Sequence, residues 1–127
     1  MTDHDRGRPI LIVEDDVQSR EGLLYLLESY GYSVVAAADS VEALETLRRD
    51  VAPCIILLDL TLPNGGGGAF RTAQLAHPRS AQIPVIVLSG RHDIESEAAR
   101  LGATGYCGKP IDCDSLLALI DRHRLRA

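Results

Sequence analysis

Short apolar runs alternate along the chain with longer segments in which apolar residues recur every three or four positions. The runs cover residues 10–13, 33–37, 54–58, 84–88 and 105–107. Three of them are nearly pure Ile, Val and Leu, which is typical of strands buried on both faces of a parallel sheet. The alternation predicts an α/β domain that is doubly wound around a five-stranded parallel sheet.

The segments between the runs predict five helices. They cover residues 17–30, 41–47, 69–76, 94–101 and 113–124. Ser40 and Asp112 suit helix N-caps, whereas Gly31 and Gly102 suit helix ends. Basic residues close the last predicted helix, where they complement the negative end of the helix dipole.

Composition excludes several classes of protein. The 127 residues suit one domain, with 46% hydrophobic and 24% charged residues and a formal net charge of −5 that disfavours direct contact with nucleic acid. We expect residues 1–8 to be a disordered lead-in and residues 9–127 to form the domain, with no signal peptide and no membrane span.

The cysteines and histidines predict no metal centre. The three cysteines have neither metal-ligand spacing nor the even count of a disulfide framework. Two of them lie in apolar or strand-like stretches, so we expect small buried hydrophobic residues and a reducing, cytoplasmic environment. The four histidines have no partner at ligand spacing, so we expect them to lie on the surface.

Polar residues stand directly after four of the predicted strands. They are Glu14 and Asp15, Asp59, Ser89, and Lys109. A single acidic residue at such a place is more often a helix N-cap or a solvated loop charge, and Asp16 fits that description. Because the carboxyl ends of parallel strands meet at one edge of the sheet, we expect the others to converge on one site.

These side chains together suit phosphoryl transfer. Crowded carboxylates repel one another, and Mg²⁺, which prefers a few carboxylate oxygens with water and phosphate oxygens, removes that repulsion. Lys109 offers a positive charge and Ser89 a hydroxyl donor to a phosphoryl oxygen. A carboxylate that attacks phosphorus itself needs no general base.

Four segments in order resemble the receiver domain of two-component response regulators. They read ILIVEDD at residues 10–16, IILLDLTLP at 55–63, PVIVLSG at 84–90 and GYCGKP at 105–110. The resemblance spans residues 10–125 and is to the chemotaxis-regulator type. It implies a flavodoxin-like sheet with strand order 2-1-3-4-5, flanked by five helices.

The resemblance also implies roles for individual residues. Asp59 looks like the aspartate that takes phosphate from a phosphohistidine on a sensor histidine kinase or a phosphotransfer protein. Glu14 and Asp15 look like the acidic pair that holds Mg²⁺ together with Asp59 and the backbone carbonyl of Thr61. Lys109 resembles the lysine that pairs with the aspartate and then with the phosphoryl group.

Ser89 and Tyr106 resemble the hydroxyl and aromatic pair that switches on phosphorylation, although without the resemblance Tyr106 would suit a core aromatic. The Lys109-Pro110 bond is expected to be cis. The resemblance places the readout surface at residues 92–125, for an unknown downstream protein, and leaves open a homodimer on phosphorylation.

The chain departs from the family pattern after Asp59. Receivers often carry an acidic residue where Gly66 stands, and Gly65–Gly68 predict a flexible connection and a late start of the third helix. A phosphate-cradling loop is disfavoured because the lysine of a P-loop is missing. Thr61 and Arg91 are expected to overlook the phosphoryl group and tune its lifetime, with a solvated loop charge as the alternative for Arg91.

Three functions remain open on the sequence. The first is a stand-alone phosphoacceptor switch that catalyses only its own phosphorylation and dephosphorylation, since no DNA-binding segment follows the last predicted helix. The second is an aspartate-nucleophile phosphatase, which Thr61 disfavours because those enzymes place a second acid there. The third is a receiver-like binding module that never takes phosphate.

Overall fold

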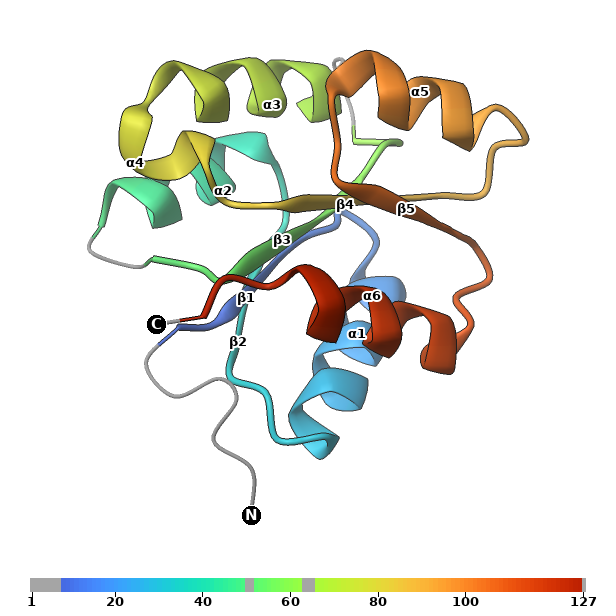
Figure 1. Cartoon of the computed structure of the whole chain (residues 1–127). Helices are drawn as coiled ribbons and strands as arrows, with labels where there is room; N and C mark the ends of the chain where they lie inside the picture. The colour runs from blue at the N-terminus through green and yellow to red at the C-terminus, as the bar shows by residue number, and fades with distance from the viewer. Residues whose placement is uncertain (1–7, 50–51, 63–65, 127) are drawn as a thin grey trace.

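The computed structural model describes residues 8–49, 52–62 and 66–126, and in them one sheet organises the chain (Figure 1). Its five parallel strands lie in the order β2-β1-β3-β4-β5, as the resemblance implied. The strands are β1 (Ile10–Val13), β2 (Val34–Ala37), β3 (Ile55–Asp59), β4 (Val85–Ser89) and β5 (Gly105–Gly108). In register, Val13 lies opposite Leu58, and Ser89 lies opposite Gly108.

Helices cover both faces of the sheet in Figure 1. They are α1 (Val17–Ser29), α2 (Ser40–Arg48), α3 (Gly66–Ala76), α4 (Pro78–Ala81), α5 (Ile94–Leu101) and α6 (Cys113–His123). Helices α1 and α6 lie on one face, and α2, α3 and α5 lie on the other. No helix in the described part of the chain is both long and apolar enough to cross a membrane.

The core consists of two layers separated by the sheet. Ile10 and Ile12 of β1 point into the layer beneath α1 and α6, whereas Leu11 and Val13 point into the layer beneath α2, α3 and α5. All four residues are fully buried. Burial on both faces explains why this strand reads as an unbroken apolar run rather than as an alternating one.

Most of the predicted boundaries are confirmed to within about a residue, and Asp16 and Asp112 cap α1 and α6 through their side chains. The predicted N-cap of α2 was wrong by one position: Asp39 accepts from the Glu42 amide, and Ser40 is already helical. The predicted cis Lys109-Pro110 bond is present. Arg8, expected to be disordered, donates to the carbonyls of Ala52 and Pro53.

The structure differs most from the sequence prediction around α3. Helix α3 begins at Gly66 rather than after the glycines, so Gly66–Gly68 are helical and the prediction of a late start was wrong. The first residue of the predicted glycine connection, Gly65, lies outside the described residues. The short helix α4, with Pro78 in its first turn, was not predicted, so the described chain has six helices rather than five.

A buried polar network holds α3 against α4 and α5. The Arg71 guanidinium donates to the carbonyls of Leu101 and Gly102 at 2.9 and 2.7 Å, and to the Gln74 side chain at 2.8 Å. Gln74 in turn donates to the Ser80 carbonyl at 2.8 Å. Because these buried polar groups find partners, the network fixes the C-terminal end of α5 to α3.

The helical glycines of α3 differ in the space around them, which predicts opposite effects of alanine. Gly68 has nothing within 4 Å of an added Cβ, so Gly68→Ala should raise the free energy of unfolding by about 0.5–1 kcal/mol. A Cβ on Gly66 would lie 3.1 Å from the Leu62 Cβ, so Gly66→Ala should gain less or destabilise the protein. Urea denaturation of both variants checks this, and equal gains would contradict it.

Candidate functional site

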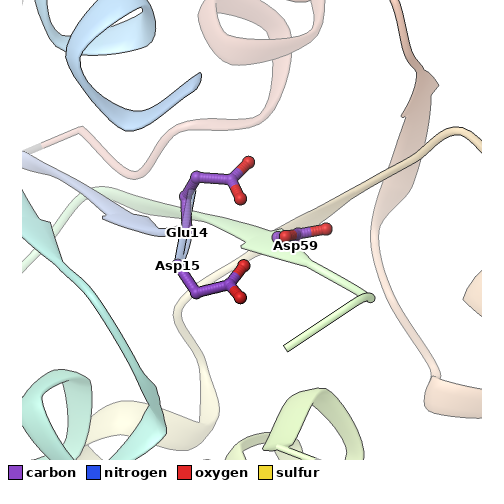
Figure 2. A group of neighbouring side chains, drawn as sticks. All are labelled: Glu14, Asp15 and Asp59. Atoms are coloured by element: carbon purple, nitrogen blue, oxygen red, sulfur yellow. The ribbon is translucent and has the colours of Figure 1, made fainter. Parts of the chain in front are cut away.

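The carboxyl ends of β1, β3, β4 and β5 bring the predicted site residues to one edge of the sheet. Glu14 and Asp15 follow β1, and Asp59 is the last residue of β3. Figure 2 shows the side chains of these three residues gathered together, and one carboxylate oxygen from each lies within 4.8 Å of the others. Glu14 and Asp59 are fully buried, whereas Asp15 is exposed.

Lys109 joins the acidic cluster from the turn after β5. Its backbone amide donates to the Ser89 carbonyl at 2.9 Å, which fixes the start of that turn against β4. Its ammonium lies 2.7 Å from a Glu14 carboxylate oxygen and 3.6 Å from Asp59 Oδ1. Lys109 therefore lies closer to Glu14 than to Asp59 in this structure, although the family resemblance pairs it with Asp59.

Thr61 holds the carboxylate of Asp59. The Thr61 amide donates to Oδ1 at 3.0 Å, and the Thr61 hydroxyl lies 2.9 Å from both Oδ1 and Oδ2. The side chain of Thr61 thus contacts the acceptor directly, as expected for a residue that overlooks the site. The hydroxyl has one proton, so it donates to one of the two oxygens at a time.

The charges at the site shift one another's pKa values in opposite directions. Burial, followed by the neighbouring Asp59 carboxylate, raises the pKa of Glu14 to about 7. Burial also opposes ionisation of Asp59, but hydrogen bonds from Glu14 and Thr61 and the Lys109 charge outweigh it and lower the pKa of Asp59. Burial would lower the pKa of Lys109, yet its contacts with Glu14 and Asp59 raise it. A proton at this site is therefore held by Glu14 before Asp59.

The donor set fits a hard divalent cation. Glu14, Asp15 and Asp59 offer carboxylate oxygens at one place. Burial, and then the neighbouring Asp59 carboxylate, raise the pKa of Glu14 to about 7, and a bound cation would offset both effects. Mg²⁺ suits such a site, because it accepts a few carboxylates and completes its shell with water or phosphate oxygens.

Ser89, Tyr106 and Arg91 are the remaining residues predicted for the site. Ser89 is fully buried at the end of β4, and its hydroxyl accepts from the Arg91 amide at 3.0 Å. Tyr106 on β5 is 41% exposed, so it is not the core aromatic that its sequence alone would suggest. The Arg91 side chain does not contact the cluster; its guanidinium makes two hydrogen bonds to Asp93.

A match to a protein-family model identifies the family of this chain. The model described as the response regulator receiver domain matches residues 10–121. The chain belongs to the response regulator receiver domain family. Receiver domains of this family are components of two-component signalling.

Individual receivers are similar along most of the chain. The response regulator MprA of Mycobacterium leprae is 37% identical over 113 residues, which are 87% of this chain but 48% of that protein. This receiver thus spans about half the length of the curated relatives it matches.

Solved structures extend the likeness to the fold. A putative response regulator from Chloroflexus aurantiacus has a TM-score of 0.83 at 28% identity, over 92% of this chain and 97% of that one. The receiver domain of the sensor histidine kinase PA1611 from Pseudomonas aeruginosa has a TM-score of 0.82 at 28% identity, with the same coverage. That structure has a magnesium ion coordinated in its active-site cleft.

Two residues, one at this receiver site and one beside it, were missed in the sequence. Arg20 of α1 donates to the carbonyls of Glu14 and Asp15 at 3.0 and 3.4 Å, and so holds the turn that carries both acids. A cation near a helix N-terminus interacts unfavourably with the helix dipole, so the position of Arg20 in the first turns of α1 could have indicated a local role for its side chain. Nothing in the sequence indicated that Asp93 pairs with Arg91; the pattern showed only that Asp93 stands before a helix.

An apolar groove opens beside the receiver site. It has a volume of about 400 Å³ and lies between α1 and the segment that follows Lys109. Gly22, Leu23 and Leu26 line it on α1, and Pro110 and Ile111 line it opposite. A protein seated in this groove would lie beside Lys109 and Glu14, which both reach its wall.

Proposed function

We propose that this receiver accepts a phosphoryl group on Asp59 in the presence of Mg²⁺ and passes the signal on through a change of shape. The observation that carries the proposal is the setting of Asp59. It is a fully buried carboxylate at a strand end, bonded by Thr61, close to the Lys109 ammonium, and beside two further acids. Its lowered pKa keeps the carboxylate ionised, as a nucleophile must be.

The transfer step is a displacement at phosphorus. An Asp59 oxygen forms a bond to phosphorus, the bond between phosphorus and the imidazole nitrogen of a phosphohistidine breaks, and the nitrogen keeps the electron pair. Glu14, Asp15, Asp59 and the Thr61 carbonyl would hold Mg²⁺, which when bound neutralises charge on the phosphoryl oxygens. Lys109 and Ser89 then donate to those oxygens.

The donor we propose is a sensor histidine kinase or a histidine phosphotransfer protein. The apolar groove lined by Lys109 and Glu14 supports this proposal, because such a protein seated in it would lie beside both residues. The readout we propose is the surface of residues 92–125, which contains α5, β5 and α6 (Figure 1). The side chain of Tyr106 is exposed on this surface. Turnover is limited to the protein's own aspartyl phosphate, so the protein acts as a switch rather than as a metabolic enzyme.

Incubation with acetyl phosphate and Mg²⁺ tests the proposal. Intact-mass spectrometry should show the addition of one phosphoryl group to the parent, and none to Asp59→Asn, which keeps the size of the side chain. Omission of Mg²⁺ should remove most of the labelling. Equal labelling of the parent and Asp59→Asn would contradict the assignment of Asp59, and an unlabelled parent would contradict the function itself.

A further inference from the structure

Asp93 stands at the N-cap of α5 but does not cap it. Its carbonyl accepts the first bond of the helix, from the Glu97 amide at 3.0 Å, yet its side chain makes no capping hydrogen bond. Three other helices begin after an aspartate, and each of those aspartates accepts from the amide three residues on: Asp16 from Ser19, Asp39 from Glu42, and Asp112 from Ser115. Asp93 is the exception among these four.

The Asp93 carboxylate is instead occupied by Arg91. The guanidinium donates from Nε to Oδ1 at 3.0 Å and from Nη2 to Oδ2 at 2.9 Å, the planar two-bond arrangement that arginine forms with carboxylates. Glu97, in the first turn of α5, is engaged by Arg100 at 2.7 Å. Arg91 and Asp93 thus form a separate pair at the start of α5.

The backbone of Asp93 is consistent with a cap that is not made. Asp93 has φ −97° and ψ 22°, whereas the three capping aspartates are extended, with ψ values of 123°, 177° and 114°. A side chain caps a helix from the extended region. Capping by Asp93 would therefore require release of Arg91 together with rotation about ψ.

Arg91 is also connected to the proposed phosphoryl site. It lies two residues after Ser89, and its amide donates to the Ser89 hydroxyl, the group proposed to contact the phosphoryl oxygens. A phosphoryl group offers arginine a doubly charged acceptor in place of a carboxylate. The pair with Asp93 is exposed, and such pairs are weak, so a stronger acceptor nearby can displace Asp93.

We propose that Arg91 and Asp93 form a latch that phosphorylation opens: Arg91 moves to the phosphoryl group on Asp59, and the released Asp93 carboxylate caps α5 through the Ser96 amide. The opening of the latch depends on the proposed function, because it requires a phosphoryl group on Asp59, whereas the closed state does not. It couples the new charge at Asp59 to the order of the first turn of α5, at the edge of the proposed readout surface.

Hydrogen exchange of the Ser96 amide, followed by NMR, tests the latch. Without phosphate, Arg91→Ala should free Asp93 to cap α5 and slow exchange at Ser96 about fivefold, which corresponds to a cap of ordinary strength. Asp93→Asn should do the same, because asparagine caps well but cannot hold Arg91 by charge. Asp93→Ala, which removes both functions, should leave exchange fast. Unchanged exchange in Arg91→Ala would overturn the latch.

Acetyl phosphate and Mg²⁺ test the opening. In the parent they should slow Ser96 exchange by the same factor, whereas in Arg91→Ala they should add nothing. A parent that gains the phosphoryl mass without a change at Ser96 would overturn the opening step alone. A parent that gains no mass would overturn the proposed function and the opening with it, while the phosphate-free comparison would still decide whether Arg91 withholds Asp93 from the helix.

Discussion

Replacement of Lys109 by methionine should destabilise the protein by about 2 kcal/mol at pH 8 without Mg²⁺, because it leaves two buried carboxylates without their cation. Lys109 lies 2.7 Å from Glu14 and 3.6 Å from Asp59, and both acids are fully buried. Methionine keeps most of the length and apolar surface of the lysine stem, so the loss reports charge rather than packing. Urea denaturation measures the change.

The pH dependence of this loss identifies its cause. Without Lys109 the pKa of Glu14 should rise further, so lowering the pH toward 5.5 protonates the site and the loss should shrink. Arg100→Met is the matched control, since Arg100 makes an equally short contact, 2.7 Å, with Glu97 but is 63% exposed. That variant should change stability little at either pH. A loss at Lys109 that does not depend on pH would contradict an electrostatic origin.

Asp59→Asn, in contrast, should stabilise the protein by about 1–2 kcal/mol at pH 8 without Mg²⁺, because it removes one of two repelling buried charges. Asparagine keeps the oxygen that accepts from the Thr61 amide. Glu14 then keeps its 2.7 Å contact with Lys109 without an opposing neighbour. Thermal and urea unfolding of the two proteins give the difference.

The sign of the pH effect follows from Glu14. Its pKa is raised from 4.5 to about 7 in the folded protein, so its protonation stabilises the parent below pH 4.5, and this stability is lost as the pH rises through 7. Asp59→Asn should flatten that decline, so its advantage should grow between pH 5 and pH 8. Addition of Mg²⁺ should close the gap by stabilising the parent more than the variant. A variant less stable than the parent at pH 8 would contradict the repulsion.

The sheet and the site could be predicted because each strand of a parallel sheet gives the same sequence pattern, an apolar run followed by the residues at its carboxyl end. Strands buried on two faces read as apolar runs, and the residues after those runs meet at one edge by the geometry of parallel strands. Glu14, Asp15, Asp59 and Lys109 were therefore placed together correctly from their positions alone. The order of the strands came from the family resemblance rather than from the runs.

The start of α3 was not predictable in the same way. Glycine disfavours helix, so the propensity of Gly66–Gly68 argues against the conformation they adopt. Close packing decides instead: a Cβ on Gly66 would press against Leu62, and one on Gly67 would touch the backbone of Asp59 and Leu60. Such contacts exist only after the strand and the helix have met, so tertiary structure overrides the local signal.

Side-chain contacts within loops were also beyond the sequence. The position of Arg91 was recognised, but nothing in the order of residues indicated that Asp93 would bind it and forgo capping. The Arg91 side chain turns to Asp93 in this structure, and the prediction that it faces the phosphoryl group stays a prediction. A two-residue separation allows several pairings, and the chosen one depends on local backbone angles.

The bonds from Arg71 hold the C-terminal end of α5, whereas no side chain caps its N-terminal end. The carbonyls of Leu101 and Gly102 are held at 2.9 and 2.7 Å by a guanidinium rooted in α3, while the opposite end, at Asp93, lacks a side-chain cap. A helix that is held at one end is expected to rotate about that end when its other end is displaced. A displacement at the start of α5 would therefore tilt the helix about Gly102. The first turn of α5, nearest the phosphoacceptor, would move most, and the residues that lead into β5 would hardly move.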